Sequence, residues 1–344
     1  MSELRALLAD TAAKVFRGID AKPDALFGHG WDRVAEAGLP GLMVREDKGG
    51  FGAGFEDALV VFREVGACAL ALPVCEAIIA NRLLDDSGCE TGNAPTTIAV
   101  KVNGTLTHAT GGLRFSGALH GVPWGGDAEH IAAIVAHEGE PHVVLLSRQD
   151  ASQLTRHENI AGEPRDDLHF VSAPLGHAAP SNRSSIDLIR MGALLRVGQM
   201  AGALDHALAM TLEHAKTRQQ FGRAISNYQA IQQQLAVFAS ETAAIGCAAA
   251  SASRASDRGP AAFEIAAAKL RANRAVDLAT SIAHEVHGAI GITREHALRR
   301  YTQRLWAWKS EFGNDRFWAM RLGAEAASRG ADLLWHDLTA RAAS

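Results

Sequence analysis

The C-terminal half of the sequence carries the strongest constraint on the fold, a helical periodicity that runs from about residue 186 to the end. Within residues 226–257, one helix face recurs at alternating steps of three and four residues: Tyr228, Ile231, Leu235, Phe238, Thr242 and Ile245. Similar patterns predict helices over 186–216 and 260–287 and a final helix from about 294. Long helices joined by short loops favour an antiparallel bundle. We therefore expect a four-helix bundle.

The middle of the chain has the short alternating pattern of β-strands. Residues 97–102 alternate, Asn103-Gly104 is a typical hairpin turn, and the alternation resumes over 105–108. Further short strands are predicted at 113–117, 131–135 and 143–146. Strands and turns at this spacing predict a small antiparallel sheet or barrel.

The first part of the chain again shows helical spacing, with short breaks. Apolar residues recur at helical intervals between Phe55 and Leu84 until Pro73 interrupts them, and the glycine-rich segment 46–52 cannot continue a helix. The predicted fold class is therefore α+β. It comprises an N-terminal helical domain (1–92), a middle antiparallel β-domain (93–185) and a C-terminal four-helix bundle (186–344).

Composition excludes several classes of function. The chain has 344 residues, of which 47% are apolar and 21% charged, as in ordinary globular proteins. Its net charge of −4 supplies no basic field for nucleic acid or for an anionic membrane. The uninterrupted apolar runs are too short to span a membrane, and the N-terminus lacks the apolar core of a signal peptide. We expect a cytoplasmic protein.

Cysteine and histidine spacing predicts no metal site. The four cysteines form no CxxC pair and are expected to be buried or incidental thiols. His284 and His287 are three residues apart, but no carboxylate-rich ligand set surrounds them. We therefore expect no bound metal.

Four short segments carry more specific information than the periodicity does. They are, in order, AGLPGL at 37–42, KGGFG at 48–52, RQQFG at 218–222 with Gln229 and Gln232 ahead of Leu235-Ala236, and EVHGAIG at 285–291. The first two resemble the GxxGLxxPExxGGxG segment of acyl-CoA dehydrogenases. The third resembles the RxxFG…Q…LA signature of that family, and the fourth resembles its QxxGGxG motif. The order of the four matches spans most of the chain.

The resemblance implies FAD as the cofactor. Arg218 suits the pyrophosphate because a guanidinium makes bidentate hydrogen bonds with phosphate. Gln229 can both donate to and accept from the adenosine half, and Gly288 leaves room for a nucleotide to approach the backbone. The other residues that the resemblance places beside FAD are Phe221, Glu285, Ala289, Trp124 and Gly313. Each of these residues, taken singly, also fits a role without a ligand, and Trp124 equally fits a turn aromatic.

The resemblance also implies an oligomer. In the similar enzymes, the positions of Arg218 and residues 285–289 contact FAD that is bound mainly by a neighbouring subunit. A homodimer, a homotetramer or an α2β2 heterotetramer with a second acyl-CoA dehydrogenase subunit is therefore expected. An acyl-CoA substrate and an electron-transferring flavoprotein as acceptor follow from the same resemblance.

Two departures from the family pattern concern the site itself. The TEPGAGSD-like loop that contacts flavin and substrate in typical members is not visible between Cys89 and Thr96. The family's catalytic base is a glutamate that precedes a glycine. A gap-free count from the QxxGGxG-like segment places that glycine at Gly313 and the base at Phe312, which cannot accept a proton. Glu311 is one residue early.

The second position from which the family supplies a base corresponds to Gly192 and Ala193, and neither is acidic. Two interpretations follow. Either Glu311 reaches the substrate through an altered loop, or the chain lacks a base.

Three functions are consistent with these observations. The first is FAD-dependent α,β-dehydrogenation of an acyl-CoA thioester in fatty acid or steroid catabolism, with this chain as the base-lacking subunit of a heterotetramer if Glu311 is not the base. The second is a flavin-dependent monooxygenase or oxidase of the same fold. The third is a non-catalytic scaffold subunit that completes a partner's FAD site. Trp306, Trp308 and Phe312 either shape a wide acyl cavity or belong to the bundle core.

Overall fold

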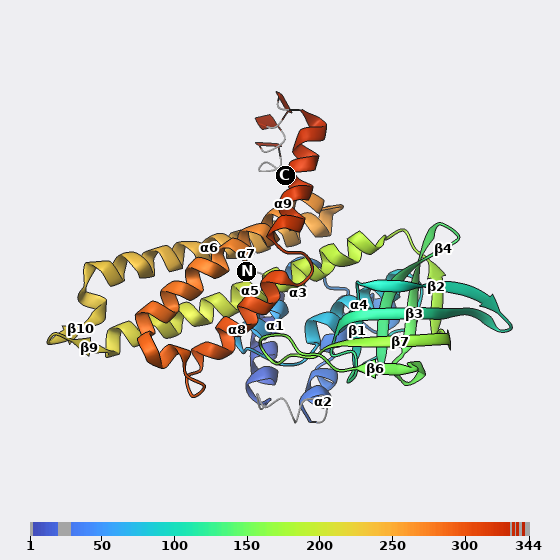
Figure 1. Ribbon diagram of the computed structural model, residues 1–344, viewed down its shortest axis with the longest axis horizontal. Coiled ribbons are helices and arrows are strands. Elements are labelled where there is room, and N and C mark those ends of the chain that lie inside the picture. Colours follow the sequence, from blue (N-terminus) through green and yellow to red (C-terminus); the bar gives the residue numbers. More distant parts are fainter. Residues whose placement is uncertain (1–2, 20–28, 331, 334, 337–338, 341–344) are drawn as a thin grey trace.

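The computed structural model describes residues 3–19, 29–330, 332–333, 335–336 and 339–340. Helices precede and follow a β-domain, so the described residues have the predicted order of elements (Figure 1). The N-terminal helices are α1 (Glu3–Arg17), α2 (His29–Glu36), α3 (Phe55–Ala67) and α4 (Val74–Asp86). Pro73 is the N-cap of α4, as expected for a residue that interrupts one helix and begins the next.

Two four-stranded sheets form the β-domain. One sheet has the strand order β1-β4-β5-β8 and the other has the order β2-β3-β7-β6. The strands are β1 (Thr96–Ala99), β2 (Val102–Ala109), β3 (Gly112–Pro123), β4 (His130–His137), β5 (Glu140–Ser147), β6 (Gln153–Thr155), β7 (Arg165–Pro174) and β8 (His177–Pro180). Buried side chains of both sheets, such as Phe115, Phe170 and Val144, form a common core.

Two details of the predicted β-domain are wrong. Asn103-Gly104 is not a hairpin turn but lies within β2, where Gly104 pairs with Gly117 of β3. The β-domain is also not wholly antiparallel, because β1 and β4 pair in parallel. Local turn preference could not reveal either feature, since both depend on which strands become neighbours in the folded sheet.

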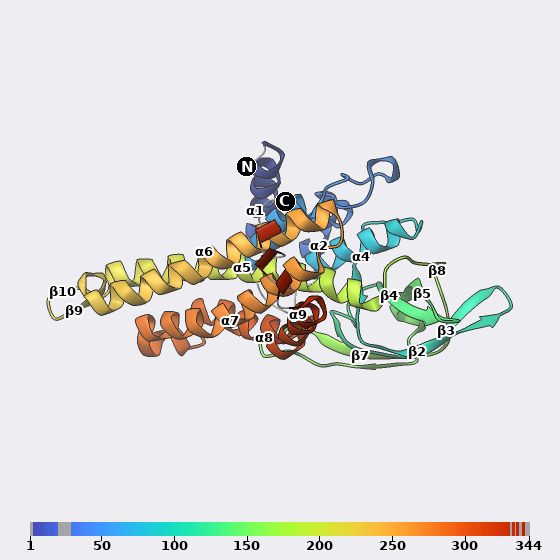
Figure 2. The same cartoon turned by 90° about the horizontal axis from the view of Figure 1, so that it is seen from above.

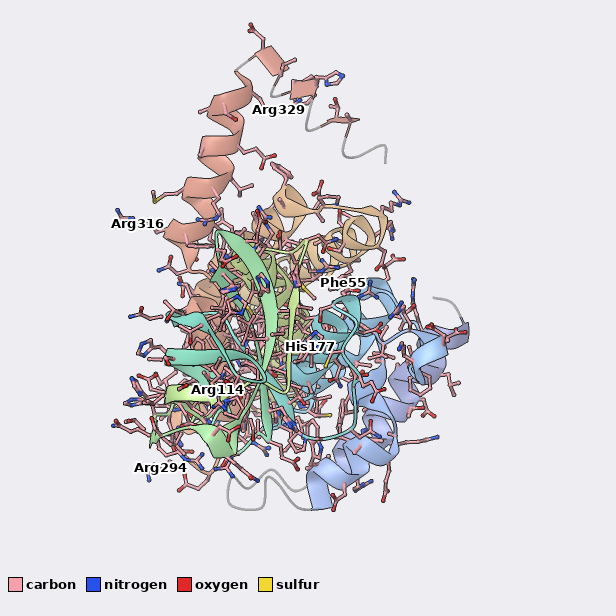
Figure 3. The ribbon with its side chains drawn as sticks, turned by 90° about the vertical axis from the view of Figure 1, so that its right-hand side faces the viewer. Phe55, Arg114, His177, Arg294, Arg316 and Arg329 are labelled. Carbon is pink, nitrogen blue, oxygen red and sulfur yellow. The ribbon has the colours of Figure 1, made fainter. Side chains whose placement is uncertain are left out.

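The C-terminal helices form the predicted bundle with one addition. The helices are α5 (Ser185–Thr217), α6 (Gln229–Arg258), α7 (Ala262–His287), α8 (Leu298–Ser310) and α9 (Asp315–Arg329), and the short strands β9 (Gln219–Gln220) and β10 (Arg223–Ala224) join α5 to α6. The single helix expected from residue 294 is wrong, because the chain turns between α8 and α9. Phe312 and Gly313 both have positive φ there, 51° and 102°. Helix α9 then projects away from the bundle, as Arg316 and Arg329 show in Figure 3.

Close helix packing joins the N-terminal helices to the bundle. Helices α3 and α5 cross where Gly66 faces Gln199 and Gly202 faces Arg63. A Cβ atom at either glycine would lie 1.9 Å from the carbonyl oxygen of the opposite residue. Only glycine permits this backbone approach. The crossing fixes α4, which follows α3, relative to the bundle.

Helix α6 has an apolar surface that the chain only partly covers. Among the described helices, α6 alone is long and apolar enough to cross a membrane by length and composition, with a mean hydropathy of 1.4 over its most apolar stretch. Only 33% of that stretch is buried within the chain. The helix lies along the outside of the bundle beside α7 (Figure 2). Its outer face and the neighbouring face of α7 expose Val237 and Leu278.

Candidate functional site

The predicted site residues fall into two groups at opposite ends of the bundle (Figure 1). The first group surrounds a cavity of about 630 Å³ beside the β9–β10 turn, which we call the far-end cavity. Its lining includes the predicted residues Arg218, Phe221, Glu285, Gly288 and Ala289. The sequence motifs at 218–222 and 285–291 are therefore adjacent in space although they lie more than sixty residues apart.

The polar groups of the far-end cavity suit part of a nucleotide. Arg218 ends α5 and has no ion-pair or hydrogen-bond partner for its guanidinium among the described residues. Gly288 has a φ of 66° and open space where a Cβ would lie. The Glu285 carboxylate accepts a hydrogen bond from Gln234 at 2.6 Å. Gln229, the first residue of α6, is exposed and is not part of the lining.

A stack of histidine rings forms the floor of the far-end cavity. His287 stacks on His214 with 4.5 Å between ring centroids and meets His296 edge-on at 4.9 Å. Burial lowers the pKa of His287 to about 4, so its ring is neutral at pH 7. His284 instead faces Thr302 at 3.1 Å. The two histidines of the His284–His287 pair thus have different partners, and the absence of a metal there stays a prediction.

The second group lies in a cleft of about 710 Å³ between the β-domain and the α8–α9 turn, which we call the interdomain cleft. Its walls come from the β1–β2 connection, β3, the segment before β7, α8 and the α8–α9 turn, and they include Lys101, Trp306, Glu311, Phe312 and Gly313. The connection from β1 to β2 is only Val100-Lys101, so no long loop enters the cleft at that point.

Phe312 and Gly192, the two positions at which the resemblance led us to expect a base, lie next to each other, and neither is acidic. Phe312 packs so closely on α5 that a Cβ at Gly192 would lie 2.3 Å from its ring. The phenyl ring is 9% exposed and lies 5.3 Å from the Arg196 guanidinium. Gly313 follows in an equally crowded place, because a Cβ there would lie 2.4 Å from Nε1 of Trp318. The turn therefore has little room for a larger side chain at Gly192 or Gly313.

Two arginines hold the Glu311 carboxylate. Its Oε1 accepts hydrogen bonds from Arg165 Nε at 2.8 Å and Asn159 Nδ2 at 3.0 Å. Its Oε2 accepts from Arg165 at 3.0 Å and from Arg196 Nε at 2.8 Å. Burial alone would raise the pKa of Glu311, but the charges of Arg165 and Arg196 outweigh it and hold the pKa well below its usual range.

This arrangement does not favour Glu311 as a base. A general base works best when its pKa lies near the working pH, and the carboxylate must have a free lone pair directed at the substrate. The oxygens of Glu311 are already occupied, and its pKa is shifted in the wrong direction. Glu311 is instead suited to bind the α8–α9 turn to the rest of the molecule.

Glu311 belongs to a larger network of buried charges. Arg196 also pairs with Glu76 of α4 at 2.7 Å, and both side chains have 0% exposure. Arg165 pairs with Glu163 at 2.9 Å, and Arg304 of α8 binds the same carboxylate at 3.0 Å. Three carboxylates and three guanidiniums therefore connect the N-terminal helices, the β-domain and the bundle.

Sequence reasoning missed this network. Its members lie up to 235 residues apart, from Glu76 to Glu311, so no local spacing relates them. One signal was available. Glu76 and Arg196 each stand within an apolar helical stretch, where a charged residue is rarely buried without a partner.

Lys269 supports the same turn from α7. Its buried ammonium donates to the carbonyl oxygens of Trp308 at 3.0 Å and Lys309 at 3.1 Å, and to Asn273 Oδ1 at 2.6 Å. Burial lowers the pKa of Lys269 to about 7. The last turn of α8 is thereby fixed immediately before Glu311.

The tryptophans that the sequence singled out have different positions. Trp124 is 2% exposed and lies behind the cleft wall, where the Arg165 guanidinium covers it at 4.9 Å from the ring centroid. Trp306 is 39% exposed and lines the cleft, whereas Trp308 is 1% exposed and donates to Glu163. Trp308 is therefore a core residue, and Trp306 and Phe312 shape the cleft.

The hydrogen-bond donors of the two sites suit the pyrophosphate and adenosine half of FAD better than the flavin half. The far-end cavity offers an unpaired guanidinium and an open backbone approach, which suit a pyrophosphate and an adenosine. The interdomain cleft is wide enough for an aromatic ring system, but Arg165 and Asn159 on its wall already serve Glu311. The other lining residues whose side chains carry donors, and which bind neither Glu311 nor Glu163, are Lys101, His120, Trp306, Ser310 and Asn314.

Comparison with known proteins identifies the family of the chain. Sequence models of the acyl-CoA dehydrogenase N-terminal and C-terminal domains match residues 1–90 and 184–316. The chain is 25% identical to acyl-CoA dehydrogenase IpdE2 of Mycolicibacterium smegmatis, over 94% of this chain and 99% of that protein.

Two solved structures share the fold. The first is the ChsE4–ChsE5 complex from Mycobacterium tuberculosis, with a TM-score of 0.87 and 20% identity over 96% of this chain and 99% of the matched one. The second is the Tcur3481–Tcur3483 steroid ACAD G363A variant, with a TM-score of 0.84 and 22% identity over 94% of this chain and 98% of that one. Because the two domain models together cover well over half of the sequence, the chain belongs to the acyl-CoA dehydrogenase family, oxidoreductases that act on CH–CH bonds.

Proposed function

We propose that this chain is the base-lacking subunit of an FAD-linked acyl-CoA dehydrogenase that works as a heteromeric complex with a second subunit of the same family. The observation that carries the proposal is the state of Glu311. It is the one carboxylate next to the family's base position, and Arg165 and Arg196 occupy both of its oxygens. The residue that the resemblance aligns with the family's base is Phe312, which cannot accept a proton.

The far-end cavity supports a role in holding FAD. Arg218 would pair with the pyrophosphate, while Glu285 and the backbone at Gly288 would contact the adenosine half. When bound, FAD would accept the hydride equivalent that leaves the β-carbon of the acyl group. This cavity and the interdomain cleft lie at opposite ends of the bundle, so one FAD cannot use both within a single chain. A neighbouring subunit would complete each site.

The uncovered face of α6 and α7 supports an oligomer. A groove of about 450 Å³ between the two helices is lined by Val237, Leu278 and Ile282 together with the polar side chains of Gln233, Gln234, Ser281 and Glu285. An apolar strip of this kind on a long helix is typical of a surface that a partner covers. The ChsE4–ChsE5 and Tcur3481–Tcur3483 assemblies, each of two different chains by name, favour the heteromeric form.

The cleft favours a bulky acyl group. Trp306, Phe312 and Phe317 give it wide apolar walls. A steroid-derived acyl-CoA fits this shape better than a short straight chain does. An electron-transferring flavoprotein as acceptor and a cytoplasmic location remain parts of the same proposal.

The proposal is tested by exchange of the substrate's α-protons. The chain, expressed alone and supplied with FAD, is incubated in deuterated buffer with straight-chain, branched and steroid acyl-CoAs, and mass spectrometry follows deuterium uptake. Removal of the α-proton needs a base but no electron acceptor, so we expect no enzyme-dependent uptake. An acyl-CoA dehydrogenase with its glutamate base is the positive control. Uptake catalysed by the wild-type chain would contradict the proposal.

A further inference from the structure

The hairpin ends of the β-domain bring together three metal-ligating side chains that the dehydrogenase chemistry does not use. His108 lies near the end of β2, and His137 is the last residue of β4. Glu138 follows in a two-residue turn with Gly139, where both residues have positive φ, 52° and 88°. Strands β2 and β4 belong to different sheets, so the cluster bridges the two sheets.

The distance between the two imidazoles is informative. Nε2 of His108 lies 3.3 Å from Nε2 of His137. Two nitrogens that bind one tetrahedral zinc ion at about 2.0–2.1 Å lie about 3.3 Å apart. The ligand atoms of His108, His137 and Glu138 all lie within 4.8 Å of one another. The side chains therefore need only small rotations to share an ion.

The surroundings of the cluster restrain the central ring. His142 of β5 meets His137 edge-on at 5.3 Å between ring centroids, and His108 meets it edge-on at 5.1 Å. His142 is itself oriented by a contact between its Nδ1 and the carbonyl oxygen of Glu140 at 3.2 Å. A ring held in this way is partly preorganised as a ligand.

We propose that His108, His137 and Glu138 form a site for a zinc-type divalent cation that joins the two sheets of the β-domain at their hairpin ends. Two imidazoles and one carboxylate suit zinc, and a water molecule would complete the tetrahedron. Magnesium and calcium, which prefer oxygen ligands, would not compete. The spacing of 29 residues between His108 and His137 hides this site from motif searches, so the sequence predicted no metal.

Zinc stoichiometry tests the proposal. Tag-free protein is treated with a chelator, dialysed against zinc chloride at pH 7.5, and assayed for bound metal beside His108→Gln, His137→Gln and His169→Gln. His169 is an exposed histidine of β7 outside the cluster and is the matched control. We expect the two cluster variants to bind one equivalent less than the wild type, and His169→Gln to bind the same amount as the wild type.

A thermal measurement supplies the second readout. In chelator all four proteins should melt at the same temperature, because the substituted side chains lie at or near the surface. Zinc should raise the melting temperature of the wild type and of His169→Gln more than that of the cluster variants, since an ion that binds only the folded state stabilises it. Equal zinc stoichiometry in the wild type and both cluster variants would overturn the proposal and leave an ordinary imidazole–imidazole hydrogen bond.

Discussion

At the residue scale, the chemistry of the interdomain cleft depends on which groups bind the Glu311 carboxylate. A carboxylate that receives hydrogen bonds from Arg165 and Arg196 is a weak base and a strong structural anchor. The same two arginines also serve Glu163 and Glu76, so each charge in the network has more than one partner. Loss of one carboxylate would leave buried guanidiniums incompletely paired.

The first prediction concerns Glu311→Gln. Removing one partner of a buried ion pair costs about 3–5 kcal/mol of unfolding free energy, and Glu311 is only 17% exposed. We expect a loss in this range, measured as a lower urea midpoint with an unchanged slope. The matched control is Asp205→Asn, which removes a carboxylate from an exposed pair with Arg63 and should cost about 1 kcal/mol or less. Equal losses of unfolding free energy in the two variants would contradict the role of Glu311 in a buried charge network.

The second prediction concerns pH. The pKa values of Glu311 and Glu163 are both lowered in the folded state, because nearby arginine charges outweigh burial. Their contribution to stability is therefore complete above the unfolded pKa of about 4.3 and is lost as the pH falls toward the lower folded values. The unfolding free energy of the wild type, measured with urea, should fall more steeply below about pH 4 than that of Glu311→Gln. Parallel curves would argue against the lowered pKa of Glu311.

The third prediction concerns Arg218→Ala at the far-end cavity. A hydrogen bond to a charged group contributes about 1.5–3 kcal/mol, so nucleotide or FAD affinity should fall roughly 10- to 100-fold. Fluorescence titration of the oligomeric protein with FAD measures the change. Lys216→Ala, an exposed cation two residues earlier that does not line the cavity, should keep wild-type affinity. Unchanged affinity in Arg218→Ala would remove this residue from the proposed site.

At the element scale, the turn between α8 and α9 determines which side chains line this end of the cleft. The periodicity from residue 294 predicted one continuous helix, because helix propensity says nothing about a turn that is held by tertiary contacts. Trp318 donates to the Phe312 carbonyl at 3.1 Å, and Lys269 fixes the preceding helical turn. The break is thus maintained by contacts from α7 and α9 together with local features, since Gly313 has a positive φ and the Asn314 side chain caps α9.

The fourth prediction compares two glycines of this region. Gly313 has a φ of 102°, and a Cβ there would lie 2.4 Å from Trp318 Nε1, so Gly313→Ala should destabilise the protein. Gly323 lies inside α9 with open space around it, so Gly323→Ala should stabilise it by about 0.5–1 kcal/mol. Thermal unfolding of both variants should show shifts of opposite sign. Shifts of the same sign would contradict the described geometry of the turn.

At the scale of the whole molecule, the order of elements was accessible from the sequence and their pairing was not. Helical and strand periodicities predicted the helix–sheet–helix arrangement because they depend on neighbouring residues. The parallel pairing of β1 with β4 and the Glu76–Arg196–Glu311 connection depend on residues that meet only in the folded chain. For the same reason, the sequence identified the motifs at 218–222 and 285–291 but did not indicate how far they lie from Glu311 in the folded chain.

This separation gives the molecule two incomplete sites rather than one complete site. The far-end cavity has a cation for a phosphate but no acyl cleft, and the interdomain cleft has wide apolar walls but a Glu311 carboxylate that Arg165 and Arg196 already bind. We therefore propose that the chain alone cannot dehydrogenate a thioester and that a partner subunit supplies what each end lacks.

An anaerobic absorption titration of the chain, expressed alone, reconstituted with FAD and treated with straight-chain, branched and steroid acyl-CoAs, tests this claim most directly. We predict that no thioester bleaches the flavin band if the protein retains FAD. If the protein remains colourless, we predict that no thioester bleaches the added FAD. Stoichiometric bleaching by any one thioester would contradict the account, and its loss in Glu311→Gln would identify Glu311 as the base after all.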